Sequence, residues 1–153
     1  MQSILLTLAL LTTFPSTSQT SWMRLESFRL AIGMSRGEAM SAVRQWHPKF
    51  GKDKNEVVVD YTAEKALTLE FRNDRLLAVR FELFAFLPEI RKAFDEKKSY
   101  LRETRGTPRR ATSSVLVYDN VLPNVLVALA ADPKSEQGKK GIGVLAVRYY
   151  DPR

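Results

Sequence analysis

The sequence predicts an α+β fold with a tandem helix-plus-antiparallel-strands arrangement, in which the helices pack on one face of an antiparallel sheet. The first observation behind this prediction is the alternation of apolar and polar residues in several segments, which is typical of strands with one buried and one solvated face. The second is that no helical pattern separates the strands within either half, so parallel crossover units are not expected. The third is the order of elements, a helix and then strands in each half, which suggests a repeat.

The first helix is expected to begin at Ser35. Ser35 and Glu38 match the S-x-x-E capping box, in which the serine is the N-cap and the glutamate lies three residues later. Pro48 disfavours helical backbone at His47, so the helix is expected to end there. The apolar residues that recur at helical spacing are Met40, Val43 and Trp46.

A polar loop over residues 49–55 leads into the strands of the first half. Alternation predicts strands at 57–61, 66–72 and 75–84, and Asn73-Asp74 between the last two is a tight-turn signal. In the third strand the side chains expected on the buried face are Leu77, Val79, Phe81 and Leu83.

The second helix opens at Pro88 and Glu89, because proline suits the first turn and a carboxylate there is stabilised by the helix dipole. Gly106 and Pro108 end it. Three further strands are predicted at 114–118, 124–130 and 142–149. The buried stripe of this helix is expected to comprise Ile90, Ala93, Phe94, the stem of Lys97, Tyr100 and Leu101.

The composition excludes several kinds of site. The 153 residues are 44% hydrophobic, which suits one folded domain. The absence of cysteine excludes disulfides, thiolate metal sites and a cysteine nucleophile, and a single histidine excludes a multi-histidine metal centre. We therefore expect no metal and no cofactor. The formal net charge of +7 favours an anionic partner or surface.

Residues 1–18 resemble a secretory signal peptide. An uncharged apolar run at 4–11 is too short to span a bilayer, and small residues at Ser16 and Ser18 suit cleavage after Ser18, with Thr20 as the alternative position. The expected product is one α+β domain over 19–153, with two packed halves at 27–85 and 87–150. It would be secreted or periplasmic.

Residues 33–37 read Gly-Met-Ser-Arg-Gly, which matches the G-x-S-x-G nucleophile elbow of serine hydrolases. A hydrolase of the Ser-His-acid type would need a histidine beside Ser35, whereas a Ser-Lys dyad is compatible with the spacing but is marked by no motif. The chain's histidine, His47, lies at the far end of the same expected helix, roughly 18 Å away at a rise of about 1.5 Å per residue. Ser35 is therefore interpreted as a helix cap. A small serine hydrolase using Ser35 is kept as an alternative.

The most basic part of the chain is 91–110, with eight basic and three acidic residues. It is interpreted either as a solvated helix face or as a contact for an anionic surface. No nucleic acid is expected, because a leader would export the chain and no exposed aromatics interleave with the basic residues. The residues expected to contact a partner are Trp46, Tyr61, Tyr118, Arg102, Arg105, Arg109 and Arg110, because aromatics and arginine dominate interface energetics.

The stretch Ile32-Gly33-Met34-Ser35-Arg36, leading into a short helix, resembles the opening of the SmpA/OmlA family of small outer-membrane assembly lipoproteins. It also resembles that of the β-lactamase inhibitor proteins that share their fold. Residues 69–77, Leu-Glu-Phe-Arg-Asn-Asp-Arg-Leu-Leu, are similar to a hairpin of these families, so the resemblance covers about 28–83. It implies a helix-on-sheet fold that binds other proteins. The chain lacks the lipoprotein cysteine and the disulfides of the two-module inhibitors.

The resulting expectation is a secreted or periplasmic, non-enzymatic binding module in the cell envelope. Its partner would be another protein, with an acidic one favoured by the charge. The third hypothesis is an envelope scaffold that contacts anionic lipid through the basic second helix. No transmembrane span is expected in the mature chain.

Overall fold

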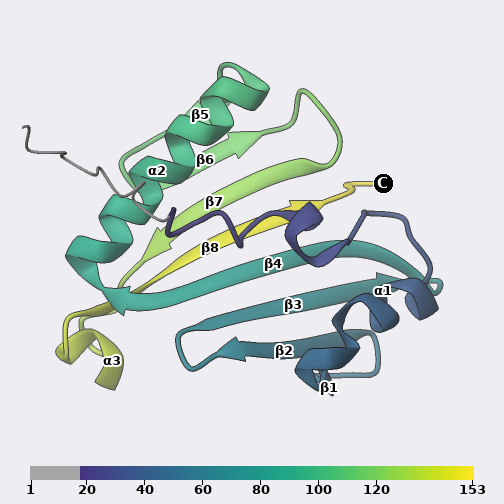
Figure 1. The fold of residues 1–153 in the computed structure, drawn as a ribbon. Helices are drawn as coiled ribbons and strands as arrows, with labels where there is room; N and C mark the ends of the chain where they lie inside the picture. Colours follow the sequence, from purple (N-terminus) through teal and green to yellow (C-terminus); the bar gives the residue numbers. More distant parts are fainter. Residues whose placement is uncertain (1–17) are drawn as a thin grey trace, which may run out of the picture.

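An eight-stranded antiparallel sheet is the framework of this protein (Figure 1). The computed structural model describes residues 18–153, so the predicted leader lies, apart from Ser18, outside the described residues. The strand order is β1-β2-β3-β4-β8-β7-β6-β5. The strands are β1 (Lys49–Phe50), β2 (Glu56–Thr62), β3 (Lys65–Arg72), β4 (Arg75–Phe86), β5 (Arg110–Ala111), β6 (Val115–Tyr118), β7 (Asn124–Ala130) and β8 (Ile142–Tyr150). The helices are α1 (Arg36–Val43), α2 (Leu87–Arg105) and α3 (Glu136–Lys139), with 3-10 turns η1 (Leu25–Phe28) and η2 (Arg44–Trp46).

The expected tandem helix-plus-strands α+β arrangement is wrong. One continuous sheet dominates the protein, with 38% of the described residues in strands and 28% helical. The physical reason is the pairing of β4 with β8, which runs from Ala78↔Tyr150 to Phe86↔Ile142. This pairing satisfies the backbone of two strands that would otherwise be exposed edges. The strands of residues 27–85 and of 87–150 therefore lie in the same sheet.

The hydrophobic core lies on one face of this sheet. It contains the inward residues of alternate sheet positions, such as Val59, Leu69, Phe81 and Val147. In Figure 1, α2, the N-terminal segment and α1 lie in front of the sheet, with the N-terminal segment crossing β4 and β8 between the two helices. Side chains of all three belong to the core cluster, so they cover this face.

The hairpin between β3 and β4 has the predicted turn and an unpredicted bulge. Asn73 and Asp74 both have positive φ (49° and 56°), as a two-residue type I′ connection requires. The register then shifts, since Phe71 pairs with Leu76 but Glu70 pairs with Ala78. Leu77 is therefore the extra residue. Leu76 is buried (1% exposed) and Leu77 is half-exposed, so the prediction that Leu77 faces the core is wrong.

The predicted capping box of α1 and the predicted glycine C-cap of α2 are both confirmed. Ser35 Oγ accepts a hydrogen bond from the Glu38 N–H, and the Glu38 carboxylate accepts one from the Ser35 N–H, which completes the capping box of α1. α2 has Pro88 in its first turn and Gly106 as its C-cap. α1 is shorter than predicted, since the turn to Trp46 is a 3-10 helix that ends at His47 in the left-handed region.

Residues 18–35, which we name the N-terminal strap, are fastened at both ends. At the far end, Gly33 N–H donates to the Leu76 carbonyl at 2.7 Å, and Leu76 N–H donates to the Met34 carbonyl at 2.9 Å. At the near end, the Glu96 carboxylate of α2 accepts a hydrogen bond from the main-chain N–H of Gln19. The strap is thus part of the folded domain.

Candidate functional site: the open face of the sheet

The face of the sheet opposite the core is a second surface, which we name the open face. It is built from alternate positions of six neighbouring strands, in the sheet order β2-β3-β4-β8-β7-β6. Five inter-strand spacings of about 4.8 Å make it about 24 Å wide. None of its side chains belongs to the core cluster, and most are half-exposed. Its members are Val58, Ala66, Thr68, Glu70, Ala78, Arg80, Glu82, Phe84, Val115, Val117, Leu126, Ala128, Val144, Ala146, Arg148 and Tyr150.

Two ion pairs lie at the centre of the open face. Arg80 and Arg148 are direct cross-strand neighbours on β4 and β8. Two adjacent like charges are unfavourable unless each is compensated. Arg80 Nε lies 2.6 Å from Glu82 Oε1, and Arg148 Nη2 lies 3.0 Å from Glu70 Oε2. The four side chains remain between 23% and 38% exposed, so a partner can still reach them.

Apolar and aromatic side chains surround these ion pairs. The guanidinium of Arg148 lies over the ring of Tyr150, 4.9 Å from its centroid, which is within cation–π range. On the same row of the sheet lie the apolar residues Val58, Leu126 and Val117. Arginine and tyrosine, which are enriched at protein interfaces, therefore lie here beside apolar side chains.

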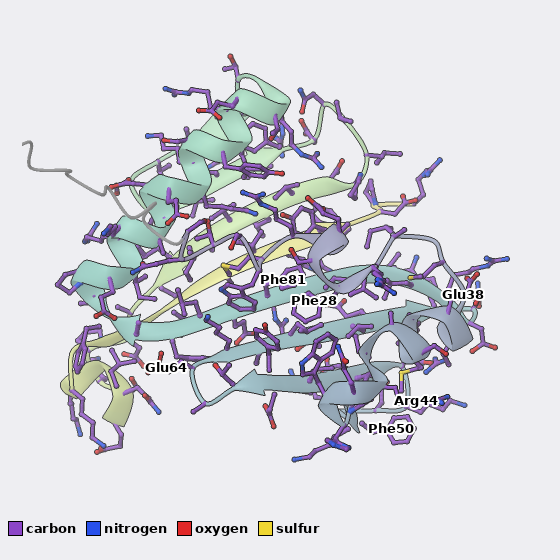
Figure 2. All side chains as sticks on the ribbon, viewed as in Figure 1. Phe28, Glu38, Arg44, Phe50, Glu64 and Phe81 are labelled. Carbon is purple, nitrogen blue, oxygen red and sulfur yellow. The ribbon has the colours of Figure 1, made fainter. Side chains whose placement is uncertain are left out.

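One corner of the open face is hollowed. Phe84, Phe86 and Ile142 line a depression of about 490 Å³ together with Glu64 and Gln137. Phe86 is 57% exposed, which is unusual for a side chain of that size. Figure 2 shows Glu64 in the turn at this end of the sheet. A hollow lined by exposed aromatics can receive an apolar anchor from a partner.

The two edges of the sheet are poorer binding sites than its face. The edge strands β1 and β5 contain two residues each, and three of their four side chains are polar or small. Such short edges offer few unpaired backbone groups for an added strand. Binding through the face is therefore the mode that this sheet favours.

The structure places Trp46 and Tyr61, two of the residues expected to contact a partner, in one aromatic cluster. The Trp46 ring centroid lies 5.7 Å from that of Tyr61 and 5.0 Å from that of Phe28. Figure 2 labels Phe28 and Phe81, whose ring centroids are 5.8 Å apart in the same cluster. Both Trp46 and Tyr61 are half-buried and lie on the core side of the sheet.

Tyr118 is separate from these rings and is 1% exposed. Its hydroxyl is buried with no hydrogen-bond partner among the described residues. Burial also raises the pKa of this hydroxyl. The side chain therefore offers almost no surface to a partner in this conformation.

The four arginines expected to contact a partner divide into two kinds. Arg105 donates to the carbonyls of Val121 (2.8 Å) and Pro123 (2.7 Å), so it holds the loop between β6 and β7. Arg109 forms an ion pair with Asp119. Arg102 and Arg110 are exposed. Half of the predicted basic site is thus engaged within the protein itself.

Ser35 serves as a cap and as part of a junction. Its Oγ lies 2.9 Å from Glu38 Oε2, and it forms an isolated antiparallel bridge with Arg75. Next to it, Arg36 donates to Asp74 at 3.0 Å and to the Lys54 carbonyl at 2.8 Å, which ties α1 to two loops. Within residues 18–153 no hydrogen bond joins Ser35 to His47. The hydrolase hypothesis therefore finds no supporting contact here.

A lysine side chain is buried between α2, β8 and the strap. Lys97 is 0% exposed, whereas the sequence predicted that only its stem would be buried. Its Nζ donates to the Met23 carbonyl (2.9 Å) and to the Tyr149 hydroxyl (2.8 Å). Burial and the neighbouring Arg24 lower the pKa of Lys97 to about 7. These two bonds join α2 and β8 to Met23, so the Lys97 amine fastens the strap to the sheet.

In the part of the chain that the structure describes, no group of three or more His, Asp or Glu side chains could hold a metal ion. None of the described helices is both long and apolar enough to cross a membrane.

Comparisons of the chain with protein family models, with curated proteins and with solved structures found no match. The resemblance of residues 28–83 to the outer-membrane assembly lipoproteins and β-lactamase inhibitor proteins therefore stays a prediction.

Proposed function

We propose that this protein is a non-enzymatic binding module that works outside the cytoplasm and docks a protein partner on the open face of its sheet. The observation that carries the proposal is the centre of that face, where Arg80, Arg148 and Tyr150 lie half-exposed among apolar side chains. Arginine and tyrosine are over-represented among the residues that contribute most to binding between proteins.

The charges of the chain favour an acidic partner. The net charge of +7 raises the local concentration of anionic molecules and speeds their association. On the open face itself the arginines are paired with Glu70 and Glu82. A partner carboxylate could replace either glutamate without leaving an arginine unpaired. This exchange gives the face a means of recognising acidic side chains.

Site-specific photocrosslinking tests the proposal. A photoreactive residue is placed at Ala146 or Ala128 on the open face, and at Arg91 or Ser99 on α2 as controls. Ala146 and Ala128 are half-exposed neighbours across β8 and β7, so either substitution projects outward. Both open-face positions are expected to capture the same polypeptide in cells that produce the protein. Capture from α2 alone, or none from the open face, would refute the proposal.

Two alternatives stay open and have distinct tests. A serine hydrolase would lose all turnover on Ser35→Ala, whereas a cap would lose only stability. A lipid-contacting scaffold would bind anionic vesicles in low salt, and Arg102→Glu with Arg110→Glu would abolish that binding. Ser35 and Arg102 lie off the open face, whereas Arg110 is the cross-strand partner of Val117 at its edge, so Arg102→Glu alone is the variant that leaves the proposed docking intact.

A further inference from the structure

The carboxylate of Glu96 on α2 accepts hydrogen bonds from the first residues of the N-terminal strap. Glu96 Oε2 accepts a hydrogen bond from the main-chain N–H of Gln19 at 3.2 Å. Glu96 Oε1 accepts bonds from the hydroxyls of Ser18 and Thr20, the latter at 3.2 Å. Burial acts to raise the pKa of Glu96, but these donors outweigh it and hold the pKa below its usual value. The group is therefore an ionised anchor for the chain.

The residues after Gln19 belong to the core and cannot be removed without loss. Thr20 is 1% exposed, and its carbonyl accepts a hydrogen bond from Met23 N–H at 2.9 Å. The Trp22 indole N–H donates to the Gln19 carbonyl at 3.0 Å. A cut after Thr20 would delete both acceptors. A cut after Ser18 would keep them.

We propose that the leader is removed between Ser18 and Gln19, and that the α-ammonium created at Gln19 binds the Glu96 carboxylate as an ion pair. This inference rests on the proposed function outside the cytoplasm, which requires the predicted leader to export the chain. Small residues at Ser16 and Ser18 stand where a leader peptidase requires them. Hydrolysis of the peptide bond consumes one water, leaves a carboxylate on Ser18, and leaves an amine on Gln19.

The new amine would lie where the Gln19 N–H now meets Glu96. An α-amino group has an unperturbed pKa of about 8, so it takes up a proton and is cationic at pH 7. In the described part of the chain no lysine or arginine forms an ion pair with Glu96. The ammonium would supply that missing cation. Its extra N–H donors would replace the hydroxyl lost with Ser18, in bonds strengthened by charge.

A double-mutant cycle tests the ion pair. The chain beginning at Gln19 is prepared with a free or an acetylated amine, each with Glu96 or with Glu96→Gln, and mass spectrometry confirms that Gln19 has not cyclised. Glu103→Gln, an exposed residue of the same helix, is the control. At pH 6.5, Glu96→Gln should lower the folding equilibrium constant about tenfold more in the free-amine chain than in the acetylated one. Equal losses in the two backgrounds would overturn the ion pair.

Sequencing the N-terminus of the exported protein tests the cleavage position. The expected first residue is Gln19. A chain that begins at Ser21, or one that retains residues 1–18, would overturn the proposed cut. Neither experiment measures binding of a partner, so their failure is distinguishable from failure of the proposed docking function.

Discussion

Lys97 Nζ lies 2.8 Å from the hydroxyl oxygen of Tyr149, and both groups donate hydrogen bonds to the main-chain carbonyl of Met23. This buried triangle connects α2, β8 and the N-terminal strap. A neutral amine has two N–H donors, and both are used here. A charged ammonium at the same place would have a third donor and a poorly solvated charge. The triangle is therefore best satisfied when Lys97 is unprotonated.

The pKa of about 7 makes Lys97 a source of pH-dependent stability. Between about pH 7 and pH 10.5 the unfolded chain holds a proton that the native chain does not, so the free energy of unfolding rises with pH. The rise from this group is at most about 5 kcal/mol, at 1.36 kcal/mol per pKa unit. Lys97→Met should remove this rise of the free energy of unfolding with pH, whereas Lys98→Met should keep it. Urea unfolding between pH 7 and pH 10.5 measures the rise in each variant. A Lys97→Met chain with the original slope would contradict this interpretation.

Tyr149 and Tyr118 offer a matched comparison, since both are buried tyrosines with different hydroxyl environments. Tyr149→Phe removes two hydrogen bonds of the triangle and should destabilise the protein by about 1–3 kcal/mol. Tyr118→Phe removes a hydroxyl that has no partner within residues 18–153, so stability should be unchanged or higher. Thermal unfolding of both variants checks the prediction. A greater loss from Tyr118→Phe than from Tyr149→Phe would show that the two environments are misassigned.

Ser35→Ala should cost about 1 kcal/mol of stability, because the Glu38 N–H loses its side-chain acceptor. Ser41→Ala is the control, since Ser41 is an exposed residue of α1 outside the cap. The wild-type protein should show no labelling by a serine-directed fluorophosphonate. Stoichiometric labelling that disappears in Ser35→Ala would support the hydrolase alternative.

The Glu70–Arg148 ion pair can be reversed without leaving a buried charge. Arg148→Glu alone places two carboxylates together and should destabilise the protein by about 1 kcal/mol. Adding Glu70→Arg restores an attractive pair, so most of that loss should return, as equilibrium unfolding would show. The exchanged protein should still bind its partner poorly, because the charge pattern of the open face is altered. No recovery of stability in the double variant would mean that the pair does not interact in solution.

Local features of the fold could be predicted from the sequence. The capping box of Ser35 and Glu38, the Asn73-Asp74 turn and the ends of α2 each depend on residues close together in the chain. Backbone geometry at such places is set by the local side chains, so a short pattern is sufficient to identify it.

Long-range features could not be predicted in the same way. The pairing of β4 with β8 joins residues more than fifty positions apart, and no sequence pattern in either strand identifies the strand with which it pairs. Burial of the Lys97 amine depends on a hydroxyl and a carbonyl from two other elements. The bulge at Leu77 looks like uninterrupted alternation in the sequence. The ion pairs of the open face could not be predicted for the same reason, because Glu70 and Arg148 lie close together only in the assembled sheet.

The most direct test of the open face is the affinity of the crosslinked partner for two variants. Ala146→Arg puts a long side chain at the centre of that face, next to Glu82 and Ala128 on the neighbouring strands. Ser99→Arg puts the same side chain on the exposed side of α2. Titration calorimetry should show at least a tenfold loss of affinity for Ala146→Arg and none for Ser99→Arg. Unchanged affinity of a folded Ala146→Arg protein would contradict docking on the open face.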